Sequence, residues 1–214
     1  MAQQVDVRDA AAVAGPNLLD HPFYQRWQRG ELQREELAGY AEQYRHFEAS
    51  LPGMLRSLIA RAADPAVAEQ LQRNLDDEES TPRAHVDLFD EFAAAAGAAD
   101  GSPQTAATRR LLDTYGELIA SSVAGGVAAI AAYESQAPAV AASKAAGLRR
   151  HYGFDDSAVA FWDVHAEMDK HHAAWGGETL ALLGAPAQET SAAARRALEA
   201  WWAFLDEREA SRPA

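Results

Sequence analysis

The chain has 214 residues, a formal net charge of −13 and no cysteine. Without thiols it can form no disulfides and no iron–sulfur clusters, and it cannot use thiol catalysis. The acidic balance argues against a nucleic-acid partner, because like charges repel the phosphate backbone. The first residues carry no apolar core of a signal peptide, and the longest weakly polar run, SSVAGGVAAIAAY, is too short to cross a bilayer. We therefore expect a cytoplasmic protein with no membrane partner.

Helix-forming residues dominate and no alternating strand pattern occurs, so the sequence predicts an all-α fold. Proline and glycine punctuate the chain and separate the expected helices. These are 17–29, 33–62, 65–97, 104–122, 124–136, 138–151, 157–183 and 188–209. No repeat or long linker interrupts the series. We expect one helical domain over 1–214, a bundle of about seven to eight helices, with flexible tips at about 1–14 and 210–214.

The expected helix 33–62 carries an amphipathic stripe. Apolar residues recur every three or four positions from Leu37 to Leu58, which is typical of a helix face packed on a core. Tyr40 and Tyr44 lie on the same stripe. A buried phenol needs a hydrogen-bond partner, so these two residues require polar neighbours that the apolar residues of the stripe do not need.

The expected helix 157–183 carries three metal-ligand types on one face. His165, Asp169 and His172 are spaced i, i+4 and i+7, which aligns their side chains on an α-helix. His171 points away from its neighbour, and the spacing favours His172. Two imidazoles and a carboxylate suit iron, manganese or zinc better than calcium or magnesium. The stripe therefore predicts part of a metal site.

Two further segments supply ligand types. Glu134 closes the small-residue run GGVAAIAAYE, where a buried carboxylate needs a partner or a cation. Glu78 and His85 are seven residues apart, two turns on one face of the expected helix 65–97, although Pro82 between them makes this geometry approximate. Taken singly, Glu78 could be a solvated surface residue and His85 a structural histidine. Together, three histidines and three carboxylates on helices can hold two metal ions inside a bundle.

The ligand pattern resembles that of the haem-oxygenase-like dimetal oxidases and oxygenases, which share their fold with the Tena and PqqC proteins. The resemblance runs from about His21 to Leu183. It is carried by Glu78-x6-His85, Tyr133-Glu134-Ser135-Gln136 and His165-x3-Asp169-x2-His172. It implies a dioxygen-dependent enzyme with two iron ions, or one iron and one manganese, and an external reductant. It also implies a homodimer.

Within that family, four segments are similar to the subgroup of the chlamydial protein associating with death domains: HPFYQRWQRGEL, DEE…H, AGGVAAIAAYESQAP and GLRRHYGF. Members of this subgroup are self-sacrificing p-aminobenzoate synthases of folate biosynthesis. The resemblance implies that Tyr24 supplies the aromatic ring, that Tyr40 assists, and that Lys144 supplies the nitrogen. Lys144 is one of only two lysines in the chain. After the acidic pair the chain reads Glu79-Ser80-Thr81-Pro82, which departs from the glycine-containing stretch of the subgroup. We do not extend the death-domain partner to this chain.

Other functions remain open at this level. A multi-turnover oxygenase of the same fold would act on an external small molecule, such as a fatty acid or an amino-acid derivative, and Tyr24 and Lys144 would then be structural. A long apolar tunnel beside the metals would favour that reading. A metal-free Tena-like hydrolase or binding bundle usually depends on a cysteine, which is absent here. A helical interaction module would leave six ligand-type residues without a role.

Overall fold

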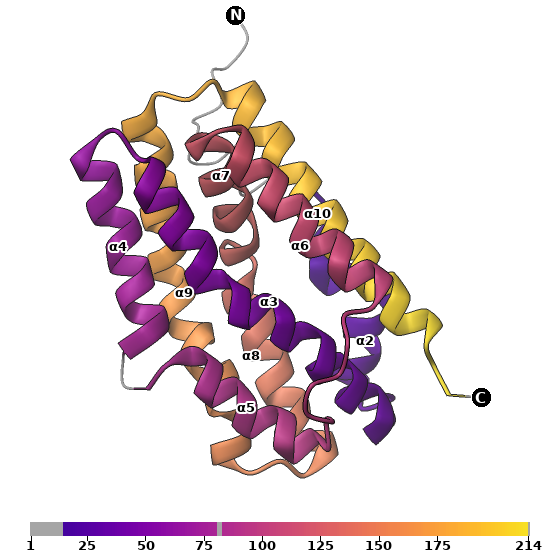
Figure 1. Cartoon of the computed structure of the whole chain (residues 1–214). Coiled ribbons are helices and arrows are strands. Elements are labelled where there is room, and N and C mark those ends of the chain that lie inside the picture. The colour runs from indigo at the N-terminus through magenta and orange to yellow at the C-terminus, as the bar shows by residue number, and fades with distance from the viewer. Residues whose placement is uncertain (1–14, 81–82, 214) are drawn as a thin grey trace, which may run out of the picture.

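The structure, a computed structural model, describes residues 15–80 and 83–213 (Figure 1). All regular elements in these ranges are helical, which confirms the predicted all-α class. In chain order they are η1 (Leu18–Asp20), α2 (Pro22–Arg29), α3 (Arg34–Arg61), α4 (Pro65–Ser80), α5 (His85–Ala96), α6 (Ala106–Ser121), α7 (Val123–Glu134), α8 (Ala137–Gly147), η2 (Leu148–Tyr152), α9 (Asp156–Leu183) and α10 (Ala187–Ala210).

The expected single helix over 65–97 is wrong. Helix α4 ends at Ser80 and α5 begins at His85. The reason lies in the sequence between them, where Pro82 has no backbone N–H and disfavours helical geometry in the residue before it. Glu78 and His85 therefore belong to different helices, and their seven-residue spacing does not place them on one helical face.

Helix α7 forms the centre of the bundle. It packs against α6, α9 and α10, and its residues from Gly125 to Glu134 are all buried. Small residues permit this close packing. A Cβ atom on Gly126 would lie 2.6 Å from a methyl carbon of Leu58, and one on Gly176 of α9 would lie 2.6 Å from the Cβ of Ala131. The small-residue run thus explains how α3 and α9 approach α7 closely.

Helix α9 is the long element that connects the centre to the opposite face. Asp155 caps its start by accepting a hydrogen bond from the backbone N–H of Ala158, and Gly184 ends it with a left-handed φ of 58°. Along its length α9 packs against α4, α5, α7 and α8 (Figure 1). Residues on its inner face therefore meet side chains from α4, α5 and α7.

Two remaining expectations concern the chain ends and the membrane. Residues 1–14 and 214, part of the predicted flexible tips, lie outside the described residues, and α10 continues to Ala210. Within the described ranges, no helix combines the length and apolarity needed to cross a bilayer.

Candidate metal centre and tyrosine–lysine cluster

The inner face of α9 presents His165, Asp169 and His172, and all three are buried. The neighbouring His171 is exposed, so His172 alone shares the stripe. The Nδ1 of His165 lies 2.8 Å from the backbone carbonyl of Phe161, to which it donates a hydrogen bond as the neutral imidazole. That bond leaves Nε2 as the nitrogen with a free lone pair.

The link between Glu78 and His85 crosses from α4 to α5. Glu78 Oε2 lies 2.9 Å from His85 Nδ1, and both side chains are buried. His85 also meets His165, with ring centroids 4.5 Å apart. The two predicted ligands therefore meet although they lie on different helices, and α9 packs against both helices.

One turn of α4 also orients ligands on two other helices. Asn74 donates a hydrogen bond of 2.8 Å to Glu134 Oε1 on α7. Asp77 Oδ2 accepts one of 3.2 Å from His172 Nε2 on α9. Partners of this kind fix the orientation of metal ligands and the tautomer of histidines. Because Asp77 holds Nε2 of His172, its Nδ1 faces inward.

The six residues singled out in the sequence converge in the core. From His172 Nδ1 the nearest carboxylate oxygens of Asp169, Glu134 and Glu78 lie at 3.3, 3.9 and 4.0 Å. Glu78 therefore faces both His172, through Oε1, and His85, through Oε2. The group can be divided into two sets of ligands that share Glu78.

Sequence reasoning missed Glu48. This residue is buried in α3, and it forms with Glu78, His85 and His165 a group of ligand atoms that all lie within 4.8 Å of one another. A signal was present, because Tyr40, Tyr44 and Glu48 follow one another at four-residue steps on the core stripe. A carboxylate on a buried stripe needs a partner or a cation, as Glu134 does.

Burial and the packed carboxylates shift several pKa values. Burial lowers the pKa of His172, but Asp169, Glu134 and Glu78 outweigh burial and raise it to about 10. Burial raises the pKa of Glu134 to about 7, against the opposing effects of His172 and Asn74. Without a metal, the cluster thus gathers protons, as expected where several carboxylates share a dry site.

Unpaired buried atoms provide a test of whether a metal fits. His85 Nε2 and Glu48 Oε1 are buried without a hydrogen-bond partner, and His172 Nδ1 faces only carboxylate oxygens, the nearest at 3.3 Å. Buried polar atoms are normally satisfied, and imidazole nitrogens with carboxylate oxygens are the donor set that iron and manganese accept. The donor set and its orphaned atoms therefore fit a metal centre.

The three residues implied by resemblance form a second buried cluster. Lys144 Nζ lies 2.5 Å from the hydroxyl of Tyr40, and the hydroxyls of Tyr40 and Tyr24 are 2.9 Å apart. Nζ also lies 4.1 Å from the centre of the Trp162 ring and 4.5 Å from that of Tyr24. Aromatic faces favour a cation, but burial outweighs this attraction and, against the charge of Glu48, holds the pKa of Lys144 well below its usual value. Burial therefore favours the uncharged form of this amine more than it would at an exposed lysine.

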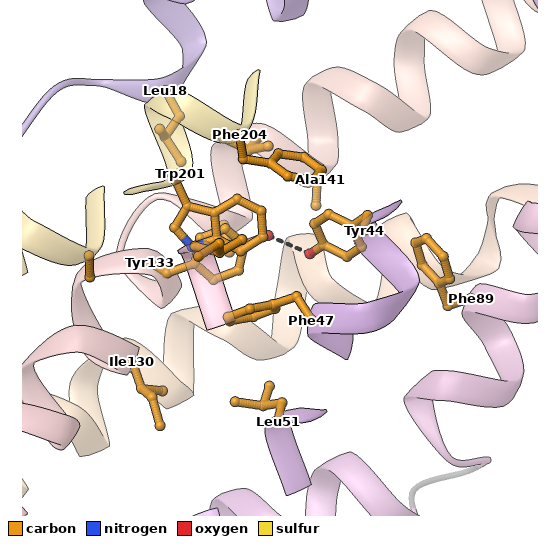
Figure 2. Close-up of a cluster of buried hydrophobic side chains, with 14 of the residues drawn as sticks. Leu18, Tyr44, Phe47, Leu51, Phe89, Ile130, Tyr133, Ala141, Trp201 and Phe204 are labelled. Atoms are coloured by element: carbon orange, nitrogen blue, oxygen red, sulfur yellow. Dashed lines mark hydrogen bonds between the residues drawn. The ribbon is translucent and has the colours of Figure 1, made fainter. Parts of the chain in front are cut away.

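A pair of phenols stands between the two clusters. The hydroxyls of Tyr44 and Tyr133 are hydrogen-bonded to each other, with Trp201 and Phe47 packed around them (Figure 2). The Tyr44 ring stacks on Tyr40, with centroids 5.4 Å apart. Both phenols of the pair also line a cavity of about 10 Å³ at the metal cluster, together with Glu48, Glu78, Glu134, His165 and Asp169. An unbroken series of aromatic residues thus joins the metal cluster to Tyr40.

Comparisons with known proteins identify the family of the chain. Residues 38–206 match a family described as iron-containing redox enzymes. The chain is 36% identical to a 4-aminobenzoate synthase from Nitrosomonas europaea, over 95% of this chain and 89% of that one. It is 32% identical to a 4-aminobenzoate synthase from Chlamydia muridarum, over 92% and 86%. A CADD-like protein of unknown function from Nostoc punctiforme has the same fold, with a TM-score of 0.79, 20% identity, and 97% and 96% of the two chains covered.

The helical bundle has the haem-oxygenase-like fold, and buried histidine and carboxylate side chains gather in its core. The chain belongs to the family of iron-containing redox enzymes, as the match over residues 38–206 shows.

Proposed function

We propose that the protein is a dioxygen-dependent 4-aminobenzoate synthase that takes the aromatic ring from its own Tyr24 and the nitrogen from its own Lys144. The observation that carries the proposal is the buried contact between Lys144, Tyr40 and Tyr24, with Nζ against one hydroxyl and the second hydroxyl beside it. The names of the relatives at 36% and 32% identity support the same product.

The metals of this proposal are two iron ions, or one iron and one manganese. Six residues would hold them: Glu78, His85, Glu134, His165, Asp169 and His172. When bound, such metals supply the reduction of dioxygen and, with an external reductant, the oxidising power for cleavage of a side chain. The surrounding residues leave little room for water, since the cavity at the cluster has only about 10 Å³, roughly the room for one water-sized molecule.

The carbon skeleton of tyrosine accounts for the product. The ring and Cβ of Tyr24 provide the seven carbons of 4-aminobenzoate, so the Cα–Cβ bond breaks and Cβ gains the carboxylate oxygens. The ring C–O bond and the Cε–Nζ bond of Lys144 also break, and a ring C–N bond forms. The simplest balanced outcome leaves a glycine residue at position 24 and a side-chain aldehyde at position 144. The net change is an oxidation in which dioxygen is the electron acceptor and water is formed.

The residues of the tyrosine–lysine cluster are suited to this exchange. A neutral amine has the lone pair that bond formation to the ring requires, and burial lowers the pKa of Lys144 and so favours that form. Tyr40 contacts both Lys144 and Tyr24, so its hydroxyl can receive or deliver the proton exchanged between them. Tight aromatic packing holds the amine against the ring, at 4.5 Å from its centre.

The size of the cavity weighs against an external substrate. Sites for small organic molecules usually enclose about 300–1,000 Å³, whereas the cavity that touches the metal cluster has about 10 Å³. The neighbouring cavity, lined by Asn74, Ile130 and Glu134 among others, has about 20 Å³. Dioxygen fits such spaces, but a fatty acid does not.

The proposal is tested by isotopic labelling without added substrate. The protein is produced with ring-labelled tyrosine and ¹⁵N-labelled lysine, freed of small molecules, loaded anaerobically with Fe(II), with or without Mn(II), and given dioxygen and a reductant. Doubly labelled 4-aminobenzoate, with side-chain loss at Tyr24 and alteration at Lys144 in peptide mass spectra, is expected. Oxygen consumption with both residues intact would instead indicate an oxygenase of an external substrate, and failure to bind metal would refute the dimetal enzyme.

A further inference from the structure

Helix α3 contributes a carboxylate to the metal cluster. We propose that Glu48 is a metal ligand, so that the centre takes seven protein side chains. This inference rests on the proposed function only in requiring that metals bind. Glu48 lies one turn beyond Tyr44, and 3% of the residue is exposed. Its side chain lines the cavity that Glu78, Glu134, His165 and Asp169 also line.

The spacing of the ligand atoms matches a single ion. One atom from each of Glu48, Glu78, His85 and His165 lies within 4.8 Å of the other three. Nitrogen and oxygen ligands sit about 2.0–2.2 Å from a transition metal, so any two ligands of one ion are at most about 4.4 Å apart. The four side chains would need to move by only a few tenths of an ångström to bind the same ion. Asp169 and His172, with Glu134, remain for the second.

Glu48 is incompletely satisfied where it lies. Its Oε1 is buried and has no hydrogen-bond partner, and an unsatisfied buried polar atom is unfavourable. Pro52 inside α3 also cannot donate a backbone hydrogen bond to the carbonyl of Glu48. Unfavourable features of this kind are retained where a ligand compensates for them.

Charge balance gives a third argument. The three carboxylates of the six-residue set carry three negative charges, one fewer than the positive charge of two divalent ions. Glu48 supplies the fourth. Burial holds the pKa of Lys144 well below its ordinary value, which disfavours a compensating positive charge on this buried lysine. With Glu48 the buried centre is neutral overall, which reduces the desolvation cost of holding two cations in the core.

Metal titration tests the assignment without depending on activity. Wild-type protein, Glu48→Gln and Glu36→Gln are titrated anaerobically with Mn(II), while free manganese is followed by electron paramagnetic resonance and bound manganese by elemental analysis. Glu36→Gln is the matched control, because Glu36 is a buried carboxylate of α3 bonded to Arg26, away from the cluster.

Two ions per wild-type chain are expected. Loss of an outer-shell partner of a ligand costs roughly 10–100-fold in affinity, so loss of a direct ligand should weaken one of the two Glu48→Gln binding steps by at least about tenfold. Glu36→Gln should bind as the wild type does. Two ions bound to Glu48→Gln with wild-type affinities would overturn the inference and leave Glu48 as a proton acceptor for the phenols. A wild type without metal would refute the dimetal function itself.

A second measurement covers the case in which Glu48→Gln does not fold. Crystals of the wild type soaked in Mn(II) are measured at the manganese absorption edge. A Glu48 oxygen at bonding distance from an anomalous peak is expected. Two occupied peaks with Glu48 outside bonding distance of both would overturn the assignment.

Discussion

Asp77 holds His172 in place, with 3.2 Å between Asp77 Oδ2 and His172 Nε2, and thereby directs Nδ1 toward Asp169, Glu134 and Glu78. The two residues are 95 positions apart and belong to α4 and α9. The orientation of this predicted ligand thus depends on Asp77, a residue outside the predicted ligand set.

Removal of Asp77 should weaken metal binding. In Asp77→Ala the imidazole of His172 can rotate, and such losses usually cost about 10–100-fold in affinity. Glu79→Ala is the control on the same helix, because Glu79 is exposed and pairs with Arg56 at the surface. Mn(II) titration provides the comparison, and equal affinities for both variants would show that Asp77 does not orient the ligand.

Metal binding should release protons. In the metal-free protein His172, with a pKa of about 10, is protonated at pH 7, and Glu134, with a pKa of about 7, is about half protonated. Both must lose the proton to become ligands, so metal affinity rises as pH rises. Calorimetry in buffers of different ionisation enthalpy should give between one and two protons released from these groups at pH 7. A binding enthalpy independent of the buffer would contradict the protonated cluster.

Lys144 should make the metal-free protein less stable as pH falls. Its pKa is lowered in the folded chain from the ordinary value of 10.5. Below pH 10.5 the unfolded chain therefore binds a proton that the folded chain does not, until the pH reaches the folded pKa. Over that window the free energy of unfolding of Lys144→Met should exceed that of the wild type. The difference should grow by about 1.4 kcal/mol for each pH unit by which the pH is lowered.

The control for that measurement is Lys170→Met, since Lys170 is exposed and pairs with Glu167. Urea unfolding at several pH values should show no such trend for it. A constant difference between Lys144→Met and the wild type would mean that the amine is charged in the core.

Tyr24→Phe should separate chemistry from metal binding. The variant lacks the ring oxygen that is exchanged for nitrogen, so no 4-aminobenzoate is expected, whereas Mn(II) uptake should be unchanged because Tyr24 does not line the cluster cavity. The lost hydrogen bond to Tyr40 should lower stability by only about 1 kcal/mol. Tyr115→Phe, which removes another buried phenol bonded to the Ala129 carbonyl, should retain product formation. Product from Tyr24→Phe would exclude the proposed ring source.

Periodicity was a good guide within single helices. The stripe of α3 and the three ligands of α9 follow from helical geometry alone, because one regular element fixes which residues share a face. The same reasoning failed for Glu78 and His85, where two helices with a break between them bring the side chains together. Glu78 and His85 belong to one cluster because α4 and α5 pack together, and the spacing of the two residues along the chain does not reveal that packing.

Contacts between distant segments could not be derived in this way. Lys144 and Tyr40 are 104 positions apart, and their pairing was implied by family resemblance rather than by spacing. Glu48 was missed because its neighbours on the stripe are core residues, and only the packing of α3 against α4 and α5 turns it toward the histidines.

The complete burial of Tyr24 has a consequence for the chain that remains after the reaction. Its ring is packed among Phe23, Tyr40 and Lys144, and removing a large buried aromatic side chain typically costs about 3–5 kcal/mol. That is a large share of the roughly 5–15 kcal/mol by which a folded domain is stable. A spent chain should therefore unfold more often and be cleared faster by proteases than a fresh one. Synthesis of the protein, rather than its turnover number, would then set how much product a cell can make.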